Sequence, residues 1–166
     1  MSTAYSIRAA TAADLPALTA LCREMERHYD GPAAVDEAVI RPALARQLAE
    51  LSGVEILVAD AAGRLLGLAT VSVVFPAARF APALFMKDIY VAAAARGRGV
   101  GTGLMRAVAR LAVARGCSRV NWNADRANAA ALDFYAGRGA RVLEESLTLL
   151  LDGDALRRLA AEADDG

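Results

Sequence analysis

The feature that most constrains this chain is a glycine-rich turn between an apolar strand and a long helix. Residues 84–91 (LFMKDIYV) are typical of a buried strand, and apolar residues at helical spacing follow from Val100. Glycine occupies every second position from 97 to 103, which allows positive φ and lets a ligand approach the backbone. The first amides of a helix lack internal partners and carry partial positive charge. The segment therefore predicts a phosphate-binding turn, with Arg96 and Arg98 adding charge.

Two common phosphate-binding patterns do not fit this turn. A dinucleotide fingerprint starting at Gly97 fails at Thr102, and one starting at Gly99 fails at Leu104. A P-loop needs lysine inside the turn, whereas the only lysine, Lys87, lies upstream. A glycine cluster alone fits a plain tight turn before a helix equally well. The spacing Arg-x-x-Gly-x-Gly, which begins at Arg96, is more specific than the glycine count.

The remaining patterns predict a mixed α/β (α+β) fold with a mostly antiparallel central sheet of about seven strands flanked by helices. A capping box at Thr11–Asp14 is expected to start the first helix, and Pro42 the second. We find no repeat and no linker, so we expect a single domain over residues 1–166. The expected strands are 6–9, 55–60, 65–75, 84–91, 119–123, 141–143 and 147–151, and further helices are expected at 100–116, 128–136 and 154–163.

Composition excludes several classes of protein. The chain has 166 residues, of which 56% are hydrophobic and 23% charged, so it is not a disordered chain. Lys+Arg and Asp+Glu both number 19, which argues against a dedicated nucleic-acid binder. No apolar run is long enough for a bilayer, so we expect no membrane partner. Two cysteines, Cys22 and Cys117, read as structural and indicate a reduced, cytoplasmic setting.

Two motifs resemble those of the GCN5-related N-acetyltransferase (GNAT) family. The sequence RGRGVGTGLM from Arg96, following KDIYV from Lys87, resembles its acetyl-CoA-binding motif. About 27 residues after Gly101, NAAALDFYAGRGA from Asn128 resembles its second motif. The resemblance covers nearly the whole chain and implies the GNAT acyl-CoA N-acyltransferase fold. It is strongest to the diamine and thialysine acetyltransferase type.

The resemblance implies acetyl-CoA as cosubstrate and no metal. In this family the fourth and fifth strands splay apart and hold the pantetheine chain between them. Asn128 would hydrogen-bond that chain, although its place before a helix also fits a plain N-cap. Cofactor-binding roles carry over to backbone groups of Ile89, Tyr90 and Val91 for the pantetheine, and to the amides of Arg96, Gly97, Arg98, Gly99, Val100, Gly101 and Thr102 for the diphosphate.

Tyr135 carries over as the catalytic residue. A phenol with a pKa near 10 is protonated at neutral pH and can donate a proton to the departing thiolate. The alternative is a half-buried aromatic side chain on an amphipathic helix. Tyr135 would also lie against the cofactor, near its sulfur.

The sequence indicates the residues that bind the acceptor amine less clearly than those that bind the cofactor. Glu26 and Tyr29, at the end of the first helix, lie where the family builds its acceptor site. Lys87 stands where polyamine acetyltransferases have glutamate, and its charge would repel a polycation. We therefore expect it to bind a carboxylate of the substrate, unless its head simply reaches solvent. The general base stays open among His28, two weaker candidates (Asp88 and Asp125) and water.

These observations predict an N-acetyltransferase that moves acetyl from acetyl-CoA to a primary amine of a small molecule, amino-acid-like or polyamine-like, by direct attack. One alternative is acetylation of a protein N-terminus or lysine. Another is a non-catalytic acyl-CoA-binding regulatory domain. A homodimer is expected because dimers are common in the subfamily. The sequence shows no cysteine and histidine cluster with metal spacing.

Overall fold

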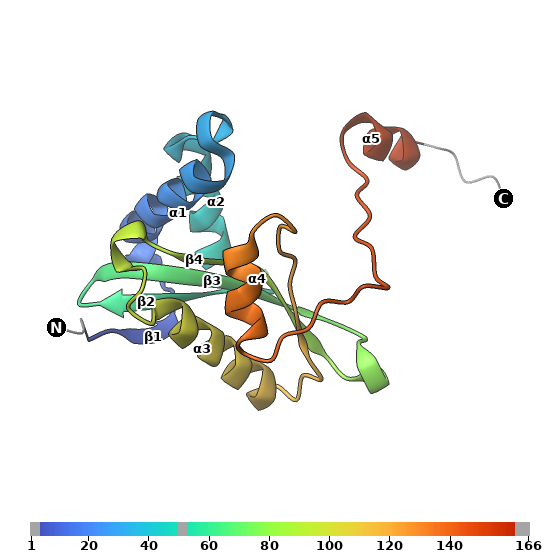
Figure 1. The fold of residues 1–166 in the computed structure, drawn as a ribbon. Helices are drawn as coiled ribbons and strands as arrows, with labels where there is room; N and C mark the ends of the chain where they lie inside the picture. The colour runs from blue at the N-terminus through green and yellow to red at the C-terminus, as the bar shows by residue number, and fades with distance from the viewer. Residues whose placement is uncertain (1–3, 50–52, 162–166) are drawn as a thin grey trace. The chain divides into compact units, whose positions relative to one another are not determined.

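The computed structural model describes residues 4–49 and 53–161. Its contacts divide the chain into unit 1, residues 1–123, and unit 2, residues 124–166, and each is described by itself. In the described residues, unit 1 forms a five-stranded sheet with helices, and unit 2 forms two helices (Figure 1). None of the helices in the described residues is both long enough and apolar enough to cross a membrane.

The sheet of unit 1 has the strand order β1-β2-β3-β4-β5. Neighbouring strands are antiparallel except β4 and β5, which are parallel. The elements of unit 1 are β1 (Ser6–Ala9), η1 (Ala12–Asp14), α1 (Leu15–Asp30), η2 (Gly31–Ala33), α2 (Glu37–Ala49), β2 (Val54–Ala61), β3 (Arg64–Val74), η3 (Ala78–Phe80), β4 (Ala83–Val91), η4 (Ala93–Ala95), α3 (Val100–Ala114) and β5 (Val120–Asn121). Unit 2 contains α4 (Ala129–Ala136) and α5 (Gly153–Ala161).

The mixed, mostly antiparallel sheet is confirmed, but the expected number of about seven strands is wrong. The described residues form five strands, and segments 141–143 and 147–151 form none. These segments have the composition of strands, yet a strand needs a partner edge for its hydrogen bonds. Within residues 124–161, the described part of unit 2, no strand forms that could supply such an edge. The composition of these segments therefore predicted their preference for an extended conformation, but it could not predict whether a partner strand would be present.

Two helix boundaries also differ from expectation. Helix α2 begins at Glu37, so Pro42 lies inside it rather than in its first turn. A proline removes one helical hydrogen bond, and Ile40, which is 7% exposed, packs into the core and secures the first turn. The final helix begins at Gly153 and is described to Ala161, so the expected end at 163 lies outside the described residues.

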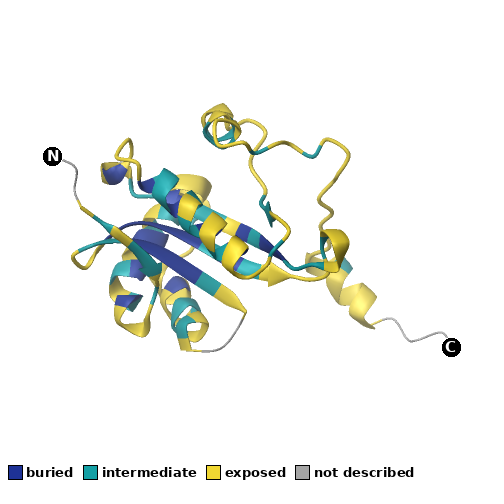
Figure 2. Ribbon diagram, turned by 90° about the horizontal axis from the view of Figure 1, so that it is seen from below, coloured by how far each residue is buried: buried dark blue, intermediate teal, exposed yellow. Residues whose placement is uncertain are grey.

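The sheet carries one apolar core on each face. Helices α1 and α2 cover one face and α3 covers the other, and the strands between them are mostly buried (Figures 1 and 2). Alternate residues of β2 serve opposite faces, as strand geometry requires. Ile56 and Val58 pack toward α1, while Leu57 and Ala59 pack toward α3.

A β-bulge at Lys87 reverses this alternation within β4. Thr70 of β3 pairs with Asp88, whereas the next residue, Val71, pairs with Met86, so Lys87 is the extra residue. Before the bulge, Met86 faces the α3 core, and after it Tyr90 faces the α1 core. Because the two residues are an even number apart, an unbroken strand would place them on one face. The bulge therefore turns Tyr90 toward α1.

Candidate active site

The predicted phosphate-binding turn forms between η4 and α3. Gly97 and Gly99 adopt left-handed conformations, with φ of +74° and +77°, which favour glycine over any residue with a side chain. A Cβ atom built at either position meets no heavy atom within 4 Å. The Gly103 amide closes the first helical turn onto the Gly99 carbonyl at 2.9 Å. The amides of Val100 and Gly101 precede that bond, so they lie outside the helical ladder and can bind an anion.

Gly103 serves packing instead of ligand binding. A Cβ atom at this position would lie 2.7 Å from Tyr5 Oη and 3.0 Å from Ile7 Cδ1. The missing side chain lets β1 approach α3 closely, and the Tyr5 hydroxyl donates a hydrogen bond to the Gly99 carbonyl at 3.1 Å. This bond fixes the residue that begins the helix. The four alternating glycines therefore do not share a single role.

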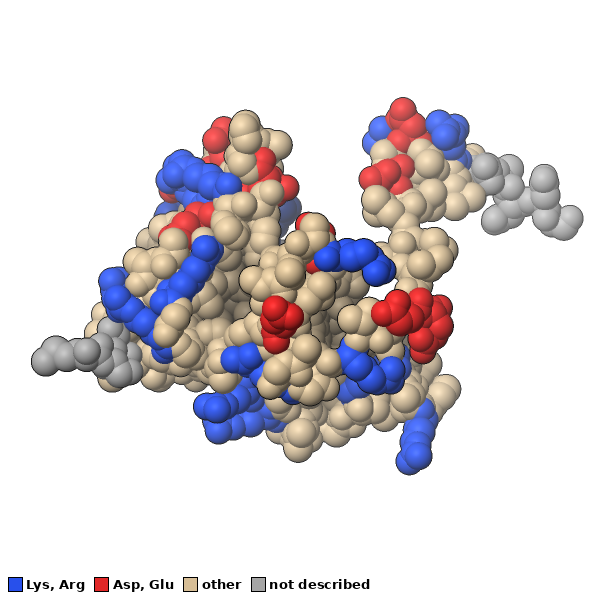
Figure 3. Space-filling model, viewed as in Figure 1, with Lys and Arg blue, Asp and Glu red and all other residues tan. Residues whose placement is uncertain are grey.

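Basic residues lie in this turn and along the helix that follows it. Between residues 96 and 119 the chain carries six arginines and no acidic residue. Figure 3 shows basic side chains along the part of the surface where Figure 1 places α3. Arg96 is held in place, because its Nε donates to the Val91 carbonyl at 3.2 Å and its guanidinium lies 5.6 Å from the centre of the Tyr90 ring. The turn therefore combines backbone donors with fixed positive charge.

Strand β4 has an edge that β5 covers only in part. Strand β5 pairs with Leu84 and Phe85 and no further. The Ala92 amide donates to the Leu66 carbonyl of β3, so by strand alternation the peptide group of Tyr90 also faces β3. The peptide groups of Ile89 and Val91 then face the opposite edge. This edge can accept an extended ligand in the manner of an added strand.

Beyond the bulge, β4 and α1 bring titratable side chains together. The Thr70 hydroxyl contacts Asp88 in two ways: it accepts from the Asp88 amide at 3.1 Å and lies 3.3 Å from Asp88 Oδ2. Burial and then the charges of Asp88 and Glu26 raise the pKa of the Cys22 thiol to about 11. Burial followed by the Asp88 charge likewise raises the pKa of Tyr29. The carboxylates of Asp88 and Glu26 thus make this region attractive to a cation.

Aromatic side chains border the same region. The ring centres of Tyr29 and Tyr90 are 6.2 Å apart, and the His28 ring lies 5.1 Å from Tyr29 and 5.8 Å from Tyr90. Lys87 is 74% exposed, and its Nζ lies 3.3 Å from Asp88 Oδ1. The structure therefore places Tyr29 and Lys87, two predicted acceptor-side residues, around Tyr90 and Asp88.

Glu24 is a candidate site residue that the sequence did not indicate. One oxygen of its carboxylate accepts hydrogen bonds from Tyr90 Oη at 3.0 Å and from the Ala93 amide at 2.7 Å. Burial raises the pKa of Tyr90, and the neighbouring Glu24 carboxylate raises it further, so the phenol stays protonated as a donor. Glu24 matches no motif. Its role depends on the bulge that turns Tyr90 toward α1, and that bulge has no signal in a single sequence.

Asn128 and Tyr135 belong to unit 2. Asn128 is the N-cap of α4, and its side-chain oxygen accepts from the Ala131 amide at 3.1 Å. Tyr135 is half-buried, with its ring centre 5.3 Å from that of Phe134. The N-cap alternative for Asn128 is thus confirmed. The cofactor-binding and catalytic roles of the two residues stay predictions.

A strand edge beside an anion-binding turn is the geometry expected for a ligand that joins an amide-rich chain to a diphosphate. The model for the acetyltransferase (GNAT) family matches residues 18–140, about three quarters of the sequence. The chain belongs to this family. Its members are acyltransferase enzymes that use acetyl-CoA as cosubstrate. The resemblance found in the two sequence motifs is therefore confirmed.

Named relatives cover part of the chain. Thialysine N-epsilon-acetyltransferase of Mus musculus is 36% identical over 80 residues, which is 46% of this chain and 47% of the relative. L-ornithine N5-acetyltransferase NATA1 of Arabidopsis thaliana is 37% identical over 75 residues, which is 45% of this chain and 33% of the relative. The chain therefore spans half or less of the length of these curated relatives.

One solved structure matches almost the entire chain. An integron cassette protein from the mobile metagenome of V. cholerae has a TM-score of 0.84 and 32% identity, covering 98% of this chain and 99% of that one. A probable acetyltransferase has a TM-score of 0.76 and 24% identity, covering 89% and 97%, and shows the fold alone.

The turn of this GNAT member fits the diphosphate of acetyl-CoA. Open space lies at both left-handed glycines, helix amides precede the first closed turn, and Arg96 supplies charge beside them. In the described residues no group of three or more His, Cys, Asp or Glu side chains is arranged to hold a metal ion.

Proposed function

We propose that the protein transfers acetyl from acetyl-CoA to a primary amine of a small, amino-acid-like molecule. The observation that carries this proposal is the left-handed Gly97–Gly99 turn at the start of α3, beside the partly uncovered edge of β4. The curated relatives support the acceptor class, because thialysine and ornithine are both amino acids with a side-chain amine.

On the cofactor side, the residues keep the roles that the family resemblance assigns, except Tyr90, whose peptide group faces β3 and leaves the pantetheine to Ile89 and Val91. The amides from Arg96 to Thr102 hold the diphosphate, and the peptide groups that face the β4 edge hold the pantetheine chain. Acetyl-CoA supplies an activated acetyl thioester. Tyr135 Oη donates the proton that the leaving sulfur needs, and Asn128 binds the pantetheine chain.

On the acceptor side, the charges match a zwitterion. Asp88 and Glu26 attract the ammonium groups of the acceptor, and Tyr29 provides an aromatic border. Lys87 offers its mostly exposed ammonium to the acceptor's carboxylate. A diamine would meet the same carboxylates, but it would be repelled by Lys87.

The turn is tested with a pair of matched glycine variants. Gly99→Ala places a methyl group in the predicted diphosphate site, so we expect the Kd for CoA to rise at least ten-fold by calorimetry. Gly116→Ala, at the far end of α3, is the control because Gly116 has φ +66° and equally open surroundings. Both variants should lose about 1 kcal/mol of stability, but only Gly99→Ala should lose affinity. Equal CoA affinity in the two variants would contradict the predicted turn.

A panel of acceptors tests the reaction itself. Release of free CoA thiol from acetyl-CoA is followed with amino acids, diamines and short peptides. The proposal expects turnover with amino acids that carry a side-chain amine. Turnover with peptides alone would favour a protein acetyltransferase, and CoA binding without turnover would favour a regulatory domain.

We also propose that the protein is a homodimer joined through segment 147–151. Leu147, Leu149 and Leu150 are each more than 80% exposed, and the described residues of unit 2 form no strand that could pair with them. An apolar, strand-forming segment that has no partner strand in the described part of its own unit favours pairing with another edge, and we propose that this edge belongs to another chain. A second copy of this chain supplies a matching edge.

A further inference from the structure

The Glu24 carboxylate links helix α1 to the chain that leads into the cofactor turn. Its Oε1 accepts from the amide of Ala93, the first residue of η4, at 2.7 Å. The same oxygen accepts from Tyr90 Oη at 3.0 Å. Two donors on one oxygen fix the position of the carboxylate, even though the residue as a whole is exposed. The Tyr90 ring, 4% exposed, is thereby held at its hydroxyl end.

The fixed Tyr90 ring in turn contacts Arg96. The Arg96 guanidinium carbon lies 5.6 Å from the ring centre, within the range of a cation–π interaction. Arg96 Nε also donates to the Val91 carbonyl at 3.2 Å. A phenol that donates to a carboxylate is richer in electrons, which strengthens its attraction for a cation. Glu24, Tyr90 and Arg96 thus form a chain of contacts from α1 to the turn.

We propose that Glu24 is a positioning residue that orients Arg96, through Tyr90, for binding the cofactor's diphosphate. The proposal rests on the proposed function, since it concerns the same cofactor. Glu24 also lies on α1 with two predicted acceptor-side residues, two positions before Glu26 and five positions before Tyr29. The helix that carries the acceptor-side residues therefore also orients a cofactor-side residue.

A double-mutant cycle tests this route by calorimetric titration with CoA. Glu24→Ala should raise the Kd for CoA about five- to ten-fold in the otherwise native protein. In the Arg96→Ala background the same change should raise the Kd less than two-fold, because the group that Glu24 orients is gone. Additive effects in the two backgrounds would overturn the proposal.

A second donor separates positioning from general damage. Acetylpantetheine is a thioester without the diphosphate, so Glu24→Ala should leave its KM unchanged within two-fold while raising the KM for acetyl-CoA. Equal losses with both donors would overturn the proposal. Failure of the wild-type protein to bind CoA would remove the proposed function and this inference together. Normal wild-type binding with an unaffected Glu24→Ala would remove the inference alone.

Two further variants keep the test decisive if Glu24→Ala folds poorly. Glu24→Gln retains an oxygen that can accept both hydrogen bonds, so its Kd should stay within about three-fold of the wild-type value. Tyr90→Phe keeps the ring but removes the donor, and it should reproduce most of the loss. Glu37→Ala removes a 48% exposed carboxylate on α2 and serves as the surface control, with unchanged Kd. Wild-type affinity in Tyr90→Phe would contradict the route.

Discussion

At the scale of single residues, the bulge at Lys87 decides what the side chains near the acceptor can do. If β4 kept all of its residues in regular alternation and ran without the bulge, Asp88 and Tyr90 would lie on the same face as Met86, toward α3. With the bulge, Tyr90 meets Glu24, and Asp88 influences Cys22 and Tyr29. Lys87 itself is left 74% exposed beside Asp88. The cationic head is thus available to a substrate carboxylate near groups that favour an ammonium.

Lys87→Gln should raise the KM for acceptors that carry a carboxylate about three- to five-fold, the effect of an exposed ion pair. The matched control is chemical: ornithine is compared with 1,4-diaminobutane, which has the same amines and no carboxylate. The KM for the diamine should stay the same or fall, because a repelling charge is removed. A similar rise in KM for both acceptors would contradict a carboxylate-binding role.

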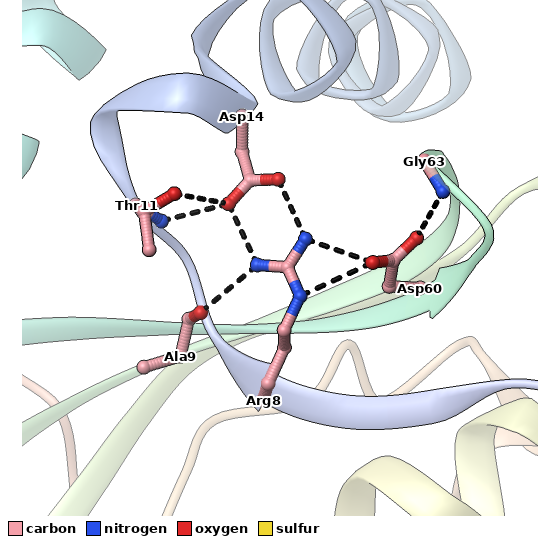
Figure 4. A network of polar contacts seen from close by, with 6 residues as sticks. All are labelled: Arg8, Ala9, Thr11, Asp14, Asp60 and Gly63. Carbon is pink, nitrogen blue, oxygen red and sulfur yellow. Dashed lines mark hydrogen bonds and ion pairs between the residues drawn. The ribbon is translucent and has the colours of Figure 1, made fainter.

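At the scale of elements, an ion-pair network joins β1, β2 and the start of α1 (Figure 4). The Arg8 guanidinium makes two hydrogen bonds of 2.7 Å to Asp14 and also binds Asp60. Asp14 in turn accepts from the Thr11 amide, completing the predicted capping box. The hydrogen bonds from Arg8, supported by Thr11, hold the pKa of Asp14 well below its ordinary value. Burial of the carboxyl opposes this shift but is the weaker effect.

Asp14→Asn should lower the free energy of unfolding at pH 7 by about 2 kcal/mol, because a charged acceptor is lost from a mostly buried network. A carboxyl with a lowered pKa stabilises the fold fully above its unfolded pKa of about 3.9 and loses this contribution as the pH falls. The difference in free energy of unfolding between the wild-type protein and the variant should therefore be constant from pH 7 to about 5 and become smaller toward pH 3. Urea unfolding at each pH measures it.

Asp154→Asn provides the control for this network. Asp154 is 78% exposed and forms an ion pair with Arg157, one turn along α5. Its replacement should change the free energy of unfolding by less than about 0.5 kcal/mol. If the difference in free energy of unfolding between wild type and Asp14→Asn does not become smaller at acidic pH, the Arg8 network contributes no pH-dependent stability.

At the scale of the whole molecule, the apolar segment 147–151 bears on assembly. Single exposed leucines are ordinary on protein surfaces, but a run of them with strand-like composition is not. Leu151 and the first helical leucine of α5, Leu156, are also about half exposed. Apolar surface in this quantity favours burial against another chain.

Sedimentation equilibrium should give twice the chain mass of 17.3 kDa for the wild-type protein. Leu149→Asp introduces a charge into the proposed pairing segment and should shift the protein toward a monomer. Val113→Asp changes a residue that is 79% exposed on α3, so it should leave the mass unchanged. A wild-type protein that is monomeric at all concentrations would contradict the dimer.

Several local features of the structure could be predicted from the sequence alone. Glycine spacing and the following amphipathic helix predicted the turn at 97–99, and Asn128 predicted the cap of α4, because conformational freedom and capping depend on neighbouring residues. The apolar runs at 55–60 and 65–75 predicted strands β2 and β3 for the same reason. Family membership followed from two such local motifs.

Tertiary structure decided which residues meet. Arg8 and Asp60 are far apart in the sequence, as are Glu24 and Tyr90, so no local pattern could pair them. The bulge at Lys87 arises from the register between β3 and β4, which depends on packing along both strands at once. The strand-like composition of segment 147–151 likewise could not predict whether the edge of another strand would be available for pairing. The conformational preference of a segment depends on its neighbouring residues. The register between strands and the contacts between distant residues are set only when the chain folds.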